Sequence, residues 1–127
     1  MHTSAFLPVV VLTLSSSALS AETSPIGHWA RGDGNARVRI EPCGDALCAI
    51  NTWVRDTSGG EDVGHRLLMR VRATGGGKYS GTAFDPQRDR SYGFTMRVQG
   101  NSMSTTGCVL AVLCKSMEIG RASCRER

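Results

Sequence analysis

The chain has 127 residues, with 15 Lys and Arg against 11 Asp and Glu and a net charge of +4. Three of these arginines and one glutamate lie in residues 119–127, so the rest of the chain carries only +2. This weak charge, without a basic cluster interleaved with aromatic residues, argues against a nucleic-acid partner, and the length allows one small domain.

Residues 1–21 are typical of a secretory signal peptide. Ala5 to Leu14 form a short, mostly apolar run, and small polar residues follow up to Ser20. We expect cleavage near Ser20 or Ala21, which makes the mature protein periplasmic or secreted. The alternative is an apolar segment of the mature fold. The run is shorter than the roughly 20 residues that cross a bilayer, so no membrane span is expected.

Turn residues recur every eight to twelve positions or so after the signal segment, a pattern typical of all-β proteins. The predicted strands are 36–42, 47–54, 66–73, 78–85, 90–98 and 102–108, and a last strand begins at Lys115 and is cut short at Glu118. Alternation places one set of side chains inward: Val38, Ile40, Leu67, Met69, Val71, Tyr92, Phe94, Met96 and Val98. No segment has an apolar period of 3.6, so almost no helix is expected.

About eight sequential strands with short loops predict a small antiparallel up-and-down β-barrel spanning residues 22–118. A barrel of this size either fills with its own side chains or holds one small ligand.

The cysteines indicate disulfides. Of five, Cys124 lies in the last nine residues, which leaves Cys43, Cys48, Cys108 and Cys114, an even number in an exported chain. We favour the pairs Cys43–Cys48 and Cys108–Cys114, because each encloses a short segment that could turn. The rival pairing would join the first hairpin to the last. A zinc site is disfavoured, since neither spacing is Cys-x-x-Cys.

Residues 119–127 form an unusual end. They show neither strand alternation nor a helix cap, and their codons can be written as a string that resembles a common short-read sequencing adapter. We interpret 119–127 as a non-native tail, and the alternative is a genuine basic terminus.

Several motifs in order carry a family resemblance. They are Pro25-Ile26-Gly27-His28-Trp29, Arg37-Val38-Arg39-Ile40 leading into Cys43-Gly44-Asp45-Ala46-Leu47-Cys48, Gly81-Thr82-Ala83-Phe84-Asp85-Pro86 followed by Tyr92, and Gly107-Cys108. In these the chain resembles a domain-of-unknown-function family of small bacterial periplasmic proteins (two-one-four-seven), whose structural type is lipocalin-like. The resemblance implies a fold and a compartment but no reaction. The sequence departs from the family pattern at Ala49, where members commonly have Gly. It also departs at the end of the domain, where members typically have a Trp-Thr-Arg strand. The second departure puts the closure of the barrel in question.

No pattern of catalytic or metal-binding residues stands out. His28 and His65 lie far apart without a partner at ligand spacing, and Gly75-Gly76-Gly77-Lys78 reads as a hairpin turn rather than a phosphate loop. We therefore expect no enzyme, no cofactor and no metal.

Large aromatic residues are the candidate ligand contacts. Trp29, Trp53 and Tyr92 could stack on a ligand at the barrel mouth, and Arg66 could meet an anionic head group. Core packing of the aromatics and a solvated arginine are the alternatives. The leading hypothesis is a periplasmic module that binds a small apolar or amphipathic molecule. The second is a protein-interaction or hydrolase-inhibitor module of the cell envelope that uses the loop from Arg55 to Gly64.

Overall fold

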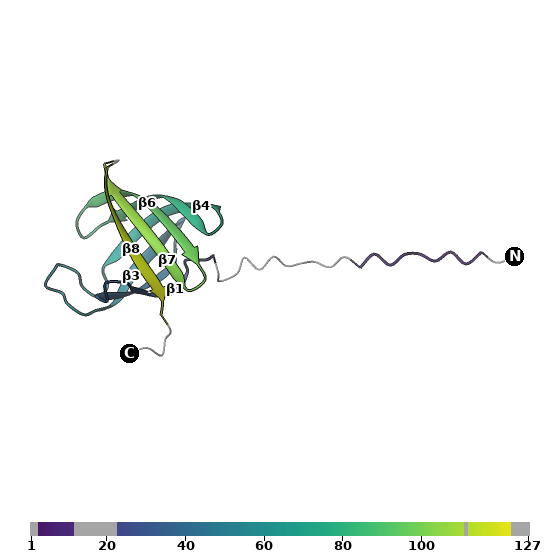
Figure 1. Ribbon diagram of the computed structural model, residues 1–127, viewed down its shortest axis with the longest axis horizontal. Helices are drawn as coiled ribbons and strands as arrows, with labels where there is room; N and C mark the ends of the chain where they lie inside the picture. The colour runs from purple at the N-terminus through teal and green to yellow at the C-terminus, as the bar shows by residue number, and fades with distance from the viewer. Residues whose placement is uncertain (1–2, 12–22, 111, 123–127) are drawn as a thin grey trace.

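The computed structural model describes residues 3–11, 23–110 and 112–122 and contains a single closed β-barrel (Figure 1). Each strand pairs antiparallel with the next in the chain, and β1 pairs with β8. The strands are β1 Gly27–Arg31, β2 Ala36–Cys43, β3 Ala46–Val54, β4 Arg66–Gly75, β5 Lys78–Asp85, β6 Arg90–Gln99, β7 Ser102–Val109 and β8 Leu113–Arg121. The predicted eight-stranded up-and-down barrel is therefore confirmed.

The closure of the barrel differs from expectation. β8 continues to Arg121, and Ile119, Gly120 and Arg121 pair with Arg31, Ala30 and Trp29 of β1. β8 thus runs three residues beyond Glu118, where the sequence analysis ends the domain. The strand could not be recognised from the sequence there, because Gly120 interrupts the alternation of side chains. The strand that pairs with these residues, β1, also lies at the other end of the chain. Residues 3–11 are exposed and belong to no strand, while the expected cleavage site and Cys124 lie outside the described residues.

Two disulfides join neighbouring strands. Cys43 bonds to Cys48 across the β2–β3 hairpin, and Cys108 bonds to Cys114 across the β7–β8 hairpin. These are the favoured pairs of the sequence analysis. Each closes a loop of a few residues, so each fixes one hairpin rather than linking distant parts of the barrel.

One end of the barrel is sealed by residues 23–26, which we call the N-terminal strap. The buried Trp29 indole donates a hydrogen bond to Pro25 O at 2.8 Å, and the Tyr79 hydroxyl donates one to Thr23 O at 2.7 Å. The Arg121 guanidinium lies 4.2 Å from the centre of the Trp29 ring. These contacts fill this end with side chains and backbone.

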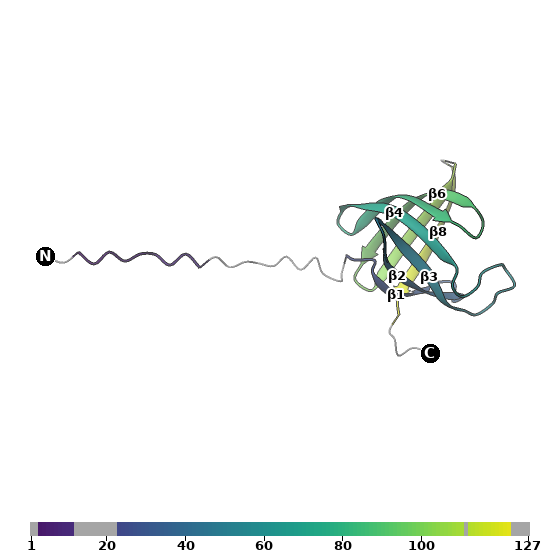
Figure 2. The same ribbon diagram turned by 180° about the vertical axis from the view of Figure 1, so that it is seen from behind.

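The opposite end, which we call the mouth, carries the β1–β2, β3–β4, β5–β6 and β7–β8 turns. The β3–β4 loop projects from it, on the side away from the point where the chain enters β1 (Figures 1 and 2). No helix long and apolar enough to span a membrane occurs among the described residues.

One glycine lets two strands approach closely. A Cβ on Gly81 of β5 would lie 2.0 Å from the Arg70 carbonyl oxygen of β4, which no side chain tolerates. This contact gives a physical reason for the glycine in the Gly81-Thr82-Ala83-Phe84-Asp85-Pro86 motif.

Candidate functional site

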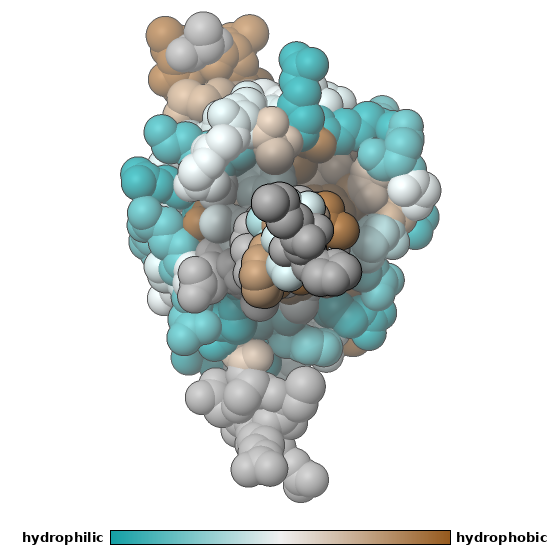
Figure 3. Space-filling model, turned by 90° about the vertical axis from the view of Figure 1, so that its right-hand side faces the viewer, coloured by the Kyte–Doolittle hydropathy of each residue, from teal (hydrophilic) through white to brown (hydrophobic). Residues whose placement is uncertain are grey.

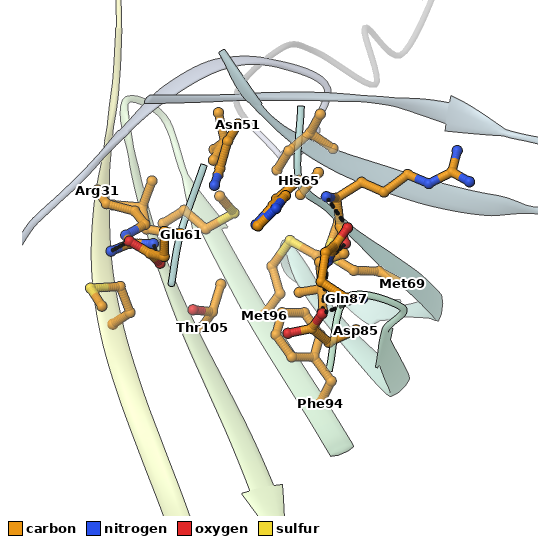
Figure 4. Close-up of a pocket in the computed structure, with 18 of the residues that line it drawn as sticks. Arg31, Asn51, Glu61, His65, Met69, Asp85, Gln87, Phe94, Met96 and Thr105 are labelled. Atoms are coloured by element: carbon orange, nitrogen blue, oxygen red, sulfur yellow. Dashed lines mark hydrogen bonds and ion pairs between the residues drawn. The ribbon is translucent and has the colours of Figure 1, made fainter. Parts of the chain in front are cut away.

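A cavity of about 260 Å³ occupies the barrel interior and reaches the mouth (Figure 4). Its deep wall is apolar and comes from six of the strands, β2, β3, β4, β6, β7 and β8. The apolar lining residues are Val38, Ile40, Ala49, Leu67, Met69, Phe94, Met96, Met103, Met117 and Ile119. Because these positions alternate with outward-facing ones, the same period-2 pattern that builds the barrel also builds the cavity wall.

Methionine dominates the wall. The chain has five methionines, and all except Met1 line the cavity. Met69, Met96 and Met103 are at most 2% exposed. Methionine is unbranched and polarizable, so it adapts to ligands of different shape more readily than leucine or isoleucine does. A wall of this composition suits a flexible apolar guest.

Polar side chains surround the opening. On one side Arg31 of β1 forms an ion pair with Glu61 of the β3–β4 loop, and a second bond between Arg31 Nη2 and Glu61 Oε2 measures 3.0 Å. Asn35 donates to the same Glu61 oxygen at 2.8 Å, and Arg31 also pairs with Asp33 at 2.6 Å. The hydrogen bond from Arg31 lowers the pKa of Glu61 below its ordinary value against the opposing effect of burial, so this carboxylate is ionised at neutral pH.

A second polar group closes the other side of the rim. Asp85, only 8% exposed, accepts bonds from Arg88 Nη1 at 2.9 Å and from Gln87 Nε2 at 2.7 Å. Burial raises the pKa of Asp85, but the bonds from Arg88 and Gln87 outweigh it and the pKa is lowered overall. Gln87 also exchanges two hydrogen bonds with the Arg66 backbone, at 2.8 and 3.0 Å, which ties the β5–β6 turn to β4.

His65 and Asn51 lie between these two groups (Figure 4). His65 Nδ1 accepts a bond from the Asp62 amide at 3.3 Å, so a neutral ring carries its proton on Nε2 and offers a donor. Asn51 donates to Asp62 O at 3.2 Å, and its backbone is bonded to Gly64 and His65. The β3–β4 loop is thus fastened to the barrel beside the opening.

The four predicted ligand contacts do not meet in one place. Only Arg66 lines the cavity, and the alternation that turns Leu67 and Met69 inward turns its side chain outward. Trp29 is fully buried under the strap. Tyr92 is half-buried at the mouth end of β6 but does not line the cavity.

Trp53 lies outside because of a β-bulge. Asn51 pairs with Val38 and Trp53 pairs with Arg37, so Thr52 is an extra residue in β3. The extra residue inverts the alternation and turns Trp53 to the outer surface, where it is 44% exposed under the Arg37 guanidinium.

Sequence reasoning missed most of the polar rim. Arg31 and Glu61 are separated by 30 positions, and no local pattern links them. Asp85 caps the β5–β6 turn, since its carboxylate accepts hydrogen bonds from the Gln87 and Arg88 amides. The methionines could have indicated the cavity wall, because two of them, Met69 and Met96, stand at predicted inward positions.

No group of three or more His, Cys, Asp or Glu side chains with metal-binding geometry occurs in the described part of the chain.

Residues 27–121 match the family described as "Uncharacterized protein conserved in bacteria (DUF2147)". The chain belongs to this family. The match runs from the first residue of β1 to the last residue of β8, so the family unit is the whole barrel, including Ile119–Arg121. No curated protein and no solved structure matches the chain. The bacterial family, the disulfides and a domain that begins at residue 27 are consistent with export.

Proposed function

We propose that the barrel is a periplasmic binding module for a small amphipathic molecule, held with its apolar chain in the cavity and its polar group at the mouth. The observation that carries the proposal is the methionine-lined cavity of about 260 Å³ beneath a polar rim. A cavity of about 150 Å³ holds a benzene molecule, so this one has room for about ten non-hydrogen atoms.

The rim determines which end of the ligand faces outward. The charged side chains that point to it are Arg31 and Arg88 against Glu61 and Asp85, so the positive and negative charges balance. His65 Nε2 adds a hydrogen-bonding group at the rim, and the Thr105 hydroxyl adds one deeper in the cavity, on the strand position that pairs with Met96 and Met117. Because these charges neutralise each other, the hydrogen-bond donor of His65 Nε2 favours a polar head that accepts a hydrogen bond.

The proposal contains no catalytic step. Both rim carboxylates are engaged by arginines, and His65 Nδ1 is occupied by a backbone amide. These side chains therefore support positioning of a ligand rather than proton transfer to one.

The test is a chain-length series of straight-chain carboxylates, from butanoate to tetradecanoate, added to the mature oxidised protein. Binding is followed by NMR of methionine methyl groups, four of which report on the cavity. Each buried methylene contributes about 0.8 kcal/mol, so affinity should rise about fourfold per carbon. The rise should level off near ten atoms, where the cavity is full.

A matched pair of variants locates the site. Ala49→Leu places three extra carbons in the cavity wall, so the affinity should level off at a carboxylate about three carbons shorter than for wild type. Ala73→Leu makes the same change at an exposed position of β4 and should leave the series unaltered. If no methionine methyl shifts with any chain at about 1 mM, or if affinity is independent of chain length, the proposal is wrong.

The second candidate is a protein-interaction module that uses the loop from Arg55 to Gly64. Its support is the exposure of this loop, including Val63 at 57%. Replacing residues 56–60 with a short Gly-Ser linker would abolish a partner's binding under this alternative. The same change would leave the carboxylate series intact, because these residues do not line the cavity.

A further inference from the structure

The β7–β8 turn presents a group of apolar side chains to solvent. Leu110 is 75% exposed, Val112 83%, Leu113 64% and Val109 38%. We call these four residues the apolar tip, and they project above the mostly polar body as brown spheres at the top of Figure 3. Single exposed apolar residues are common, but four within five positions form a patch that calls for a partner.

One residue of the apolar tip has a costly backbone conformation. Leu110 has φ 58°, in the left-handed region that leucine disfavours. Two other hairpin turns of the barrel reach the same region with glycine, at Gly44 (φ 64°) and Gly100 (φ 59°). The Cys108–Cys114 disulfide closes the base of the tip. A leucine kept where glycine would be less strained indicates that its side chain serves a purpose.

Positive charge lies immediately behind the apolar tip. Lys115 follows it in β8 and pairs with Gly107. Arg90 is the first residue of β6, the strand that pairs with β7, and so lies at the same end of the barrel as the apolar tip. Both cations are exposed, and neither forms an ion pair within the described residues. The acidic residues nearby are Asp89, next to Arg90 in the chain, and Asp33, whose pKa is lowered by its hydrogen bond from Arg31 and also by the charge of Lys115. Apolar side chains backed by cations are the arrangement that binds an anionic lipid surface.

We propose that the apolar tip docks the barrel on the surface of an anionic lipid bilayer, with the tip inserted among the acyl chains and Lys115 and Arg90 near the phosphates. A second copy of this chain fits less well. Four side chains bury at most a few hundred Å², whereas a stable dimer buries at least about 1,000 Å². Since the tip is at the mouth end, docking turns the cavity opening toward the lipid. The proposal stands without any ligand in the cavity.

The test is flotation of the mature, oxidised protein with phosphatidylethanolamine vesicles, with and without phosphatidylglycerol. The variant is Leu110→Asn combined with Leu113→Thr, because asparagine tolerates the left-handed region and threonine suits a strand. We expect wild type to bind vesicles and the double variant to bind at least about tenfold more weakly. Ile26→Thr, an exposed residue at the sealed end, should bind within about twofold of wild type.

Two further measurements keep the result interpretable. Arg90→Gln with Lys115→Gln should weaken binding only to vesicles that contain phosphatidylglycerol. In the variant Leu113→Trp, the fluorescence of the introduced tryptophan should be quenched by lipids brominated in the acyl chain. This quenching reports insertion even if the double variant folds poorly. Failure of wild type to float at about 1 mM lipid overturns the proposal. So does undiminished flotation of a folded double variant. A concentration-dependent dimer that the double variant abolishes, without flotation of wild type, would assign the tip to self-association instead.

Discussion

Arg121 offers a direct test of how the sealed end of the barrel is held. Its guanidinium stacks on the fully buried Trp29 at 4.2 Å from the ring centre. It also donates to the carbonyl oxygens of Ser24 and Ile26 at 3.3 Å and of Gly100 at 3.2 Å. One side chain therefore connects β8 to the strap, to β1 and to the β6–β7 turn. The perturbation is Arg121→Ala.

The expected loss is about 3 kcal/mol of unfolding free energy. A largely desolvated cation–π contact contributes about 2 kcal/mol. The three hydrogen bonds are long and partly exposed, so together they count for less than one charge-assisted bond, roughly 1 kcal/mol. A domain of this size loses about 4–8 °C of Tm per kcal/mol, which predicts a fall of about 12–24 °C.

Urea denaturation followed by tryptophan fluorescence measures this loss. Arg72→Ala is the matched control, because Arg72 is exposed on β4 and makes no ion pair within the described residues. Arg121→Lys keeps the charge but not the three-way donor geometry, so it should recover part of the stability. A loss below about 1 kcal/mol, or one equal to that of Arg72→Ala, would refute the reasoning.

Three further predictions concern acid, the apolar tip and one disulfide. The pKa values of Asp33, Glu61 and Asp85 are all lowered in the folded protein, so their contribution to stability is complete above the ordinary values of 3.8 to 4.5 and is lost as pH falls below them. Urea denaturation should give constant stability from neutral pH down to that range and a fall beneath it, and Glu61→Gln should make the fall shallower; an unchanged slope would contradict this. Leu110→Gly should raise the unfolding free energy by about 0.5–1 kcal/mol, because relief of the left-handed strain exceeds the entropy cost of glycine. A destabilised Leu110→Gly protein would mean that the leucine is held by packing. Cys108→Ser with Cys114→Ser should cost about 2 kcal/mol, the loop entropy of a short disulfide ring, and a loss below about 0.5 kcal/mol would show that the hairpin is fixed by its strand pairing alone.

Both disulfides and all the strands except β1 were predictable because the information that defines them is local. β5 begins and ends at the predicted residues, and β2, β3, β6 and β7 differ by one residue at an end. Alternation within each strand also identified the buried side chains, among them Met69, Met96 and Val98. Both cysteine pairs follow from hairpin spacing for the same reason.

The site was less predictable because its parts come together only when the barrel closes. A single bulge at Thr52 inverts the face on which Trp53 lies, and nothing in the neighbouring sequence marks it. The Arg31–Glu61 pair joins β1 to a loop two strands further on. Ile119–Arg121 have no readable strand pattern, yet they complete the barrel because β1 supplies their partner.

The even number of strands has a practical consequence for attachment. In an up-and-down barrel of eight strands, the first strand starts and the last strand ends at the same rim, and here that rim is the sealed end. A fusion partner, affinity tag or surface linker joined before Gly27 or after Arg121 would therefore leave from the base of the barrel. Immobilised in this way, the protein would present its opening and its apolar tip to whatever flows past, whichever terminus carried the anchor.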